Sequence, residues 1–152
     1  MFIMNKKLLI RILLGAWFIF LFYVLIIPNK VHREGMIDQE QLSNKLFGAY
    51  SSHRYEEGLN KETYLSSIAF IDKQELSKHD LNDKIADLKK HGWKQVYPAR
   101  EDQITLCFGN QNEIIIVYPT KLNYPNGMRL TEADLANWII NYTYTYKGGE
   151  YC

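Results

Sequence analysis

The sequence predicts an α+β domain whose helices pack on a mainly antiparallel sheet, preceded by a single transmembrane helix. Three observations lead to this fold class: one long apolar run near the start, two helical patterns with capping residues, and short β-branched or aromatic segments separated by turns. The chain is 47% hydrophobic and 14% aromatic, which is enough to build a packed core. We divide it into a cytoplasmic stub with the transmembrane anchor (1–28), a connector (29–37) and an extracytoplasmic α+β domain (38–152).

The apolar run covers residues 8–27 and contains one charge, Arg11. Twenty helical residues rise about 30 Å, which matches the hydrocarbon core of a bilayer. Arg11 lies near the start of the run, where its long side chain can reach the head groups. Pro28 ends the helix because its ring removes a backbone donor. We therefore expect residues 8–27 to cross a lipid bilayer.

Two alternatives to an anchor are a cleaved signal peptide and a buried core helix. A signal peptide has a shorter apolar centre and a cleavage site between small residues, which the run lacks. A run that is apolar all round is also rare in a small soluble domain. Three basic residues (Lys6, Lys7, Arg11) precede or enter the run and two (Lys30, Arg33) follow it, so the positive-inside rule favours a cytoplasmic N-terminus. The prediction is a single-pass inner (plasma) membrane protein with its C-terminal domain outside the cytoplasm.

The two cysteines, Cys107 and Cys152, form no C-x-x-C motif and no cluster of zinc spacing. An even pair in an exported domain predicts a disulfide, which would stabilise the fold by roughly 4 kcal/mol and hold the C-terminus in place. Two unpaired thiols, one in a strand and one on a loose tail, are the alternative.

The first half of the domain begins with a helix. Asp38 can cap a helix that continues to about Tyr50, with its apolar residues on one stripe. Residues 51–60 are polar and include Gly58, which predicts a loop. Residues 63–71 are β-branched and aromatic enough for a strand, although a helix is the alternative there.

The next unit is a helix over residues 78–91. Ser77 and Asp80 form a capping box at its start, and Gly92 is the expected residue just after its end. The segment 93–97 then predicts a short edge strand, because it stops at Pro98.

Residues 103–108 and 113–118 predict a β-hairpin around a turn at 109–112. The second of these strands is apolar on both faces, so each face should be covered. The segment 119–127 predicts a long loop. Another capping box, Thr131 with Asp134, begins a pattern of helical spacing that predicts an amphipathic helix containing Leu135, Trp138, Ile139 and Tyr142.

The residues from 142 to 146 alternate Tyr and Thr, which favours a final strand with Tyr142, Tyr144 and Tyr146 on one face. Tyrosine is enriched in binding surfaces because it offers a large contact area and a hydroxyl. Such a face can also form part of the core, and both interpretations stay open. The long loop adds two further aromatic candidates. The predicted partner-binding residues are Tyr118, Tyr124, Trp138, Tyr142, Tyr144 and Tyr146.

No catalytic or cofactor motif is present: there is no Walker loop, no G-x-G-x-x-G, no G-x-S-x-G and no H-E-x-x-H. The four histidines are scattered, and we expect neither a metal nor a cofactor. His79 with Asp83 could face a metal, Cys107 could be a nucleophile and Glu56 with Glu57 could form an acid pair, but solvated or structural roles are the simpler interpretation. After the apolar run the chain has 15 basic and 17 acidic residues, which argues against nucleic-acid binding.

These features favour a membrane-anchored, non-catalytic domain that binds a protein in the bacterial envelope, in the manner of an immunity or inhibitor protein. One alternative is an accessory bitopic subunit of a membrane complex, whose small residues Gly15 and Ala16 would contact another helix. A second alternative is an envelope hydrolase whose catalytic residues come from distant parts of the sequence. The expected partners are the lipid bilayer, through residues 8–27, and one envelope protein.

Overall fold

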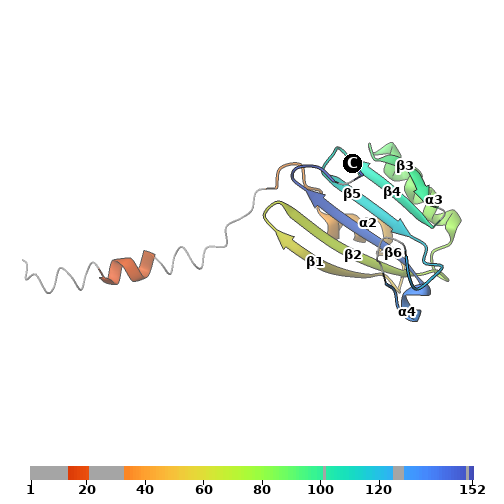
Figure 1. Cartoon of the computed structure of the whole chain (residues 1–152), viewed down its shortest axis with the longest axis horizontal. Coiled ribbons are helices and arrows are strands. Elements are labelled where there is room, and N and C mark those ends of the chain that lie inside the picture. The colour runs from red at the N-terminus through yellow and green to blue at the C-terminus, as the bar shows by residue number, and fades with distance from the viewer. Residues whose placement is uncertain (1–13, 21–32, 101, 125–128, 150) are drawn as a thin grey trace, which may run out of the picture. The chain divides into compact units, whose positions relative to one another are not determined.

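The computed structural model describes residues 14–20, 33–100, 102–124, 129–149 and 151–152, with only the backbone described at 97–100 (Figure 1). The chain divides into two compact units, Met1–His32 and Arg33–Cys152. Residues 14–20 of the first unit are helical, and all seven are exposed. No helix of the described residues is both long and apolar enough to cross a membrane. Most of the predicted anchor, residues 8–27, lies outside the described residues, so the anchor stays a prediction.

The second unit is an α+β domain with a six-stranded antiparallel sheet, which confirms the predicted fold class of this part. The strand order is β1-β2-β6-β5-β4-β3, so β1 and β3 are the edges and β6 is central (Figure 1). The elements in chain order are α2 (Gln39–Phe47), β1 (Arg54–Lys61), β2 (Tyr64–Asp72), α3 (Lys78–Lys90), β3 (Lys94–Arg100), β4 (Gln103–Phe108), β5 (Asn112–Val117), α4 (Glu132–Leu135) and β6 (Asn137–Thr145).

Several predicted elements are confirmed with the capping chemistry that predicted them. Asp38 Oδ1 accepts a hydrogen bond from the Gln41 amide at the start of α2, which ends at Phe47, a few residues before the predicted limit. Ser77 caps α3, and Gly92 follows that helix with a positive φ of 94°. The strand β2, the edge position of β3 and the β4–β5 hairpin also agree with the prediction.

The predicted loop over residues 51–60 is wrong, because residues 54–61 form the edge strand β1. Seven of its eight residues are exposed, so the strand lacks the apolar alternation that would have revealed it. Its pairing with β2 is interrupted between Glu57 and Asn60 by a register shift. Gly58 lies in that interval, and a Cβ there would lie 2.9 Å from Ser66 Oγ. The glycine that suggested a loop therefore marks a close approach inside a strand.

The predicted amphipathic helix through Tyr142 is also wrong. The Thr131–Asp134 capping box forms, but α4 ends at Leu135 and the chain continues as the strand β6. Trp138, Ile140 and Tyr142 lie in the core on the helix-covered face, while Ile139 belongs to a second cluster. In a strand that is apolar on both faces, the apolar residues also fall at the i, i+3, i+4 positions typical of a helix. Here the segment is a strand because it pairs with β2 and β5. Strand β3 also continues through Pro98 to Arg100, beyond the predicted end.

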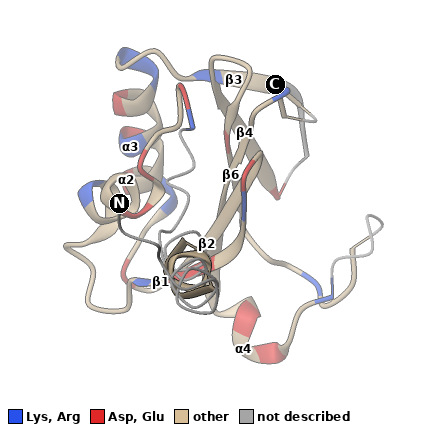
Figure 2. Cartoon of the chain, turned by 90° about the vertical axis from the view of Figure 1, so that its left-hand side faces the viewer, with Lys and Arg blue, Asp and Glu red and all other residues tan. Residues whose placement is uncertain are grey.

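The helices α2 and α3 cover one face of the sheet (Figure 2). The main core lies between them and includes Phe47, Leu81, Ile114 and Ile140. A smaller cluster on the other face contains Val117, Tyr124 and Ile139, with partly buried side chains that include Ile68 and Ile115. Both faces of β5 are therefore covered, as its apolar sequence predicts.

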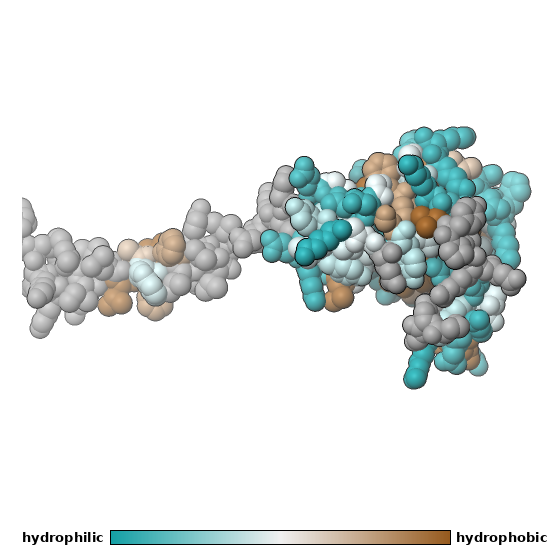
Figure 3. All heavy atoms as spheres, turned by 45° about the horizontal axis from the view of Figure 1, so that its top comes forward, coloured by the Kyte–Doolittle hydropathy of each residue, from teal (hydrophilic) through white to brown (hydrophobic). Residues whose placement is uncertain are grey.

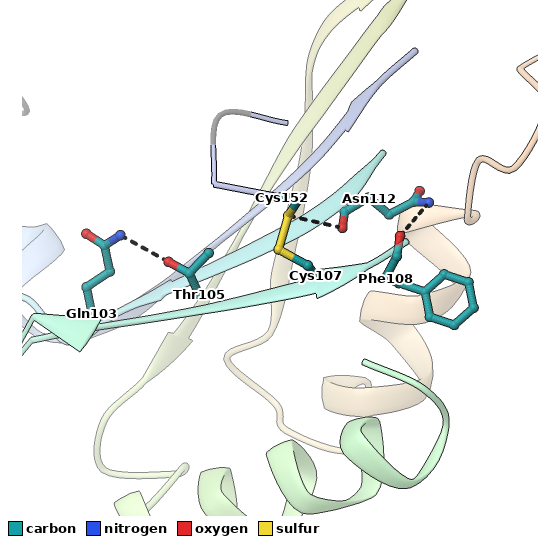
Figure 4. The surroundings of a disulfide bond; sticks show 6 residues. All are labelled: Gln103, Thr105, Cys107, Phe108, Asn112 and Cys152. Carbon is teal, nitrogen blue, oxygen red and sulfur yellow. Dashed lines mark hydrogen bonds between the residues drawn. A yellow bond between two sulfur atoms is a disulfide. The ribbon is translucent and has the colours of Figure 1, made fainter. Parts of the chain in front are cut away.

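The predicted disulfide between Cys107 and Cys152 is present, with the two sulfurs 2.06 Å apart (Figure 4). Cys107 is buried in β4, and Cys152 Sγ lies 3.8 Å from the carbonyl oxygen of Asn112 at the start of β5. The bond therefore joins the end of the chain to the β4–β5 hairpin.

Removal of this bond should destabilise the domain. The double substitution Cys107→Ala with Cys152→Ala should lower the free energy of unfolding by up to about 4 kcal/mol, because a loop of 45 residues regains its entropy in the unfolded chain. The measurement is chemical denaturation of the full chain in detergent. Reductant should destabilise the parent protein similarly and leave the double variant unchanged; equal stability of oxidised and reduced parent protein would contradict the prediction.

Candidate functional site

The structure divides the six predicted partner-binding residues into buried and accessible groups. Four of them are buried: Tyr124, Trp138, Tyr142 and Tyr144. Trp138 nevertheless lines a small cavity beside Tyr118, which is described below. Burial raises the pKa of Tyr142, and the Tyr144 hydroxyl donates to the carbonyl oxygen of Glu34 at 3.0 Å. The core interpretation that the sequence left open therefore matches these residues. Tyr118 is half-buried and Tyr146 is exposed.

Tyr118 lies at the centre of an aromatic and cationic cluster. It directly follows β5, and its ring meets the Trp138 ring edge-on, with the centroids 4.7 Å apart. The Nζ atom of Lys73 lies 3.9 Å from the Tyr118 centroid, and that of Lys78 lies 4.3 Å from it. Two ammonium groups thus contact one electron-rich ring. Neither lysine was predicted from the sequence. Lys73 directly follows β2 and Lys78 begins α3, so both lie about 40 residues before Tyr118 in the chain.

A cavity of about 130 Å³ adjoins this cluster, and we call it the Tyr118 recess. The start of α3, the start of β4, the end of β5 and the start of β6 converge on it. The lining among the described residues combines apolar, amide and charged side chains: Lys78, Leu81, Asn82, Asp102, Gln103, Ile104, Ile116, Tyr118 and Trp138. A small recess with an aromatic wall and a few polar groups is typical of a site that receives one side chain of a partner.

The two lysines of the Tyr118 recess have different roles. Lys73 Nζ donates hydrogen bonds of 2.6 Å to two carbonyl oxygens, those of Pro119 and Leu135. Its pKa lies below the ordinary value because of burial and, secondarily, the nearby charge of Lys78. Lys78 forms no hydrogen bond with any described residue, and its ammonium group lines the recess. Lys73 therefore joins the loop after β5 to the segment before β6, while Lys78 can interact with a ligand.

A second recess of about 400 Å³ lies between α2 and α3. Three aspartates and two lysines give it a mixed, slightly acidic wall: Lys45, Leu46, Tyr50, Asp80, Asp83, Lys84 and Asp87. Lys84 Nζ lies 5.3 Å from the Tyr50 ring centroid. Burial and the charge of Asp80 raise the Tyr50 pKa. Most of the charged groups are solvated helix-surface residues, so this groove is less specific than the Tyr118 recess.

A residue of α2, Ser43, forms a hydrogen bond with His53, and no sequence pattern predicted this Ser–His pair. Ser43 Oγ and His53 Nε2 are 2.9 Å apart, and burial lowers the His53 pKa. Ser43, however, is 0% exposed. A nucleophile must reach its substrate, so the buried Ser43 side chain matches a structural hydrogen bond better than catalysis.

The surface histidines form no metal centre with the described residues. His79 Nδ1 lies 3.5 Å from Asp83 Oδ2 and 4.0 Å from Asp80 Oδ1, on an exposed helix face. Among the described residues, no group of three or more His, Cys, Asp or Glu side chains could hold a metal ion.

Comparison with protein-family models, curated proteins and solved structures finds no match for this chain. The functional argument therefore depends on the sequence and on the geometry of the domain.

The different roles of Lys73 and Lys78 can be tested by substitution. Lys73→Met should lower the free energy of unfolding by about 2 kcal/mol, because the Pro119 and Leu135 carbonyl oxygens lose their shared donor. Lys78→Met, the matched control, loses only a contact with the Tyr118 ring and should cost less than about 1 kcal/mol. Chemical denaturation of the full chain in detergent measures both, and equal costs would contradict the assignment.

Proposed function

We propose that this protein is a membrane-anchored, extracytoplasmic domain that binds another protein of the bacterial envelope and acts as an immunity or inhibitor protein. The anchor is the apolar run at residues 8–27, and the N-terminus is cytoplasmic. The disulfide supports an oxidising compartment, because structural disulfides are rare in the cytosol of most organisms.

The observation that carries the proposal is the Tyr118 recess. There the ammonium group of Lys78 lies over the Tyr118 ring and has no hydrogen-bond partner among the described residues. A partner's carboxylate or polar anchor residue would find a cation, the amides of Asn82 and Gln103 and an apolar floor there. The described residues of the lining include one carboxylate, Asp102, and neither histidine nor cysteine. This chemistry supports recognition rather than acid–base catalysis.

A photo-cross-linking amino acid at Asn82, in the full chain in its native membranes, tests the proposal. Asn82 is exposed and lines the recess, and the exposed Glu62 in the β1–β2 turn is the matched control position. We expect the cross-linker at position 82 to give one discrete cross-linked product. The cross-linker at position 62 should give no product of the same mass. Lys78→Glu should weaken the complex by more than about 1 kcal/mol. When the partner is not saturating, this corresponds to a several-fold lower yield of the cross-linked product.

The same experiment separates inhibition from other roles. The partner identified by cross-linking is then purified in its free form. If the protein is an inhibitor, the full parent chain should lower the activity of this partner, and the Lys78→Glu variant should lower it less. Identical adducts from both positions, or none from position 82, would contradict binding at the Tyr118 recess.

The accessory-subunit alternative depends on Gly15 and Ala16, whose small side chains leave room on the surface of the helical segment 14–20. A close contact with another helix would fit that surface. Replacement of residues 8–27 by an unrelated anchor should abolish the complex if this alternative holds, and should preserve it if the Tyr118 recess is the binding site.

A further inference from the structure

We infer that one end of the sheet contacts the bilayer surface through exposed aromatic and aliphatic side chains. This attachment end consists of residues 33–37, the β1–β2 turn (62–63), the β4–β5 turn (109–111) and the segment after β6 (146–149). The inference rests on the proposed membrane anchor and adds an orientation of the domain, with lipid head groups as the contacting partner.

The chain is firmly fixed where it joins the domain. Arg33 Nη2 donates to Asn60 Oδ1 at 2.5 Å and to the Lys61 carbonyl oxygen at 2.6 Å. The Asn112 side chain donates to the Gly35 carbonyl oxygen at 2.8 Å and accepts from the Ile37 amide at 3.0 Å. With the Tyr144–Glu34 hydrogen bond, these contacts hold residues 33–37 of the connector against one end of the strands.

The distance to the predicted bilayer is short. Five residues, 28–32, separate the end of the apolar run from Arg33. At no more than about 3.6 Å per residue, this interval spans about 20 Å at most. The polar head-group layer is itself about 5–8 Å deep on each side of the hydrocarbon core. The attachment end therefore stays within reach of the bilayer surface.

Four large apolar side chains are exposed around this same end. They come from β1, β4 and the C-terminal segment, and their exposed fractions are high: Leu59 57%, Phe108 38%, Tyr146 54% and Tyr151 46%. In the described part of the domain, only Leu122 (38%) is a further exposed large hydrophobic residue, and it lies in the loop after β5. On the face of the domain seen in Figure 3, hydrophilic side chains surround small apolar areas.

Contacts of the backbone hold the chain at or next to the two tyrosines of this set. The Tyr146 amide donates to the Thr63 carbonyl oxygen at 3.0 Å, and its own carbonyl oxygen accepts from Gln111 Nε2 at 2.9 Å. Tyr151 precedes Cys152, which is bonded to β4. Tyrosine is enriched at membrane interfaces because its ring is apolar and its hydroxyl is polar. Because the backbone at these positions is already held, contact with lipid costs less chain entropy than it would on a loose tail.

The charges within the attachment end are balanced, because Arg33 and Lys147 are offset by Glu34 and Glu62. The contact should therefore depend on aromatic and aliphatic partitioning and little on anionic lipid. The Tyr118 recess lies at the other end of the strands, where Gln103 pairs with Val117, and Val117 with Ile139. This orientation turns the recess away from the bilayer, toward an arriving partner.

Quenching of tryptophan fluorescence by brominated lipids tests the contact. The full chain is reconstituted in phosphatidylcholine vesicles as Tyr146→Trp and, as the matched control, Leu122→Trp; both positions are exposed, at opposite ends of the sheet. The parent emission, which includes Trp17, is subtracted from each. We expect brominated lipid to reduce the added Tyr146→Trp emission at least about twofold more than the added Leu122→Trp emission. Anionic lipid at 30 mol% should leave that ratio unchanged.

The outcomes distinguish this inference from the proposed anchor. If the protein does not float with the vesicles, the anchor fails and the lipid contact fails with it. If it floats but the two added tryptophans are quenched equally, the anchor stands and the orientation is wrong. A blue-shifted but unquenched Tyr146→Trp would indicate a protein contact, such as a second copy, and would also overturn the inference. Tyr151→Trp repeats the test should Tyr146→Trp lose its native near-UV spectrum.

Discussion

The hydrogen bonds between the connector and the ends of β5 and β6 are the constraint on which the rest of the account depends. Asn112 is buried, and its side-chain amide donates to the Gly35 and Phe108 carbonyl oxygens and accepts from the Ile37 amide. A buried amide satisfied in this way is costly to disrupt, since each lost partner leaves a polar group without water. Residues 33–37 are consequently held at the ends of β5 and β6, so the chain enters the domain at this end of the sheet.

Strand β6 links this constraint to the Tyr118 recess. Tyr144 at one end of the strand donates to the connector, and Trp138 at the other end packs on Tyr118 and donates to the Leu76 carbonyl oxygen. Both side chains are buried on a strand that pairs along its length with β2 and β5. Tyr144 and Trp138, which were predicted for a binding face, thus connect the two ends of β6 to neighbouring segments of the domain.

The sequence predicted what depends on local chemistry and missed what depends on register. Ser77, Asp80 and Gly92 define α3 by capping alone, and the cysteine count predicted the disulfide. Strand β1 was missed because an exposed edge has no apolar period, and β6 because residues apolar on both faces also fit a helix. Tyr118 was predicted from its place beside a long loop. Its contacts with Lys73 and Lys78 arise from the sheet topology, which no local pattern encodes.

Hydrogen exchange at the Met36 and Ile37 amides of the full chain in lipid membranes tests the fixed connector most directly. Met36 donates to the Arg33 carbonyl oxygen at 3.2 Å and Ile37 to Asn112 Oδ1 at 3.0 Å. We expect both amides to exchange at least about 100-fold more slowly than in an unstructured peptide, and Asn112→Ala to accelerate Ile37 while α3 stays protected. Exchange of Met36 and Ile37 at the unstructured rate in the parent protein would contradict the account.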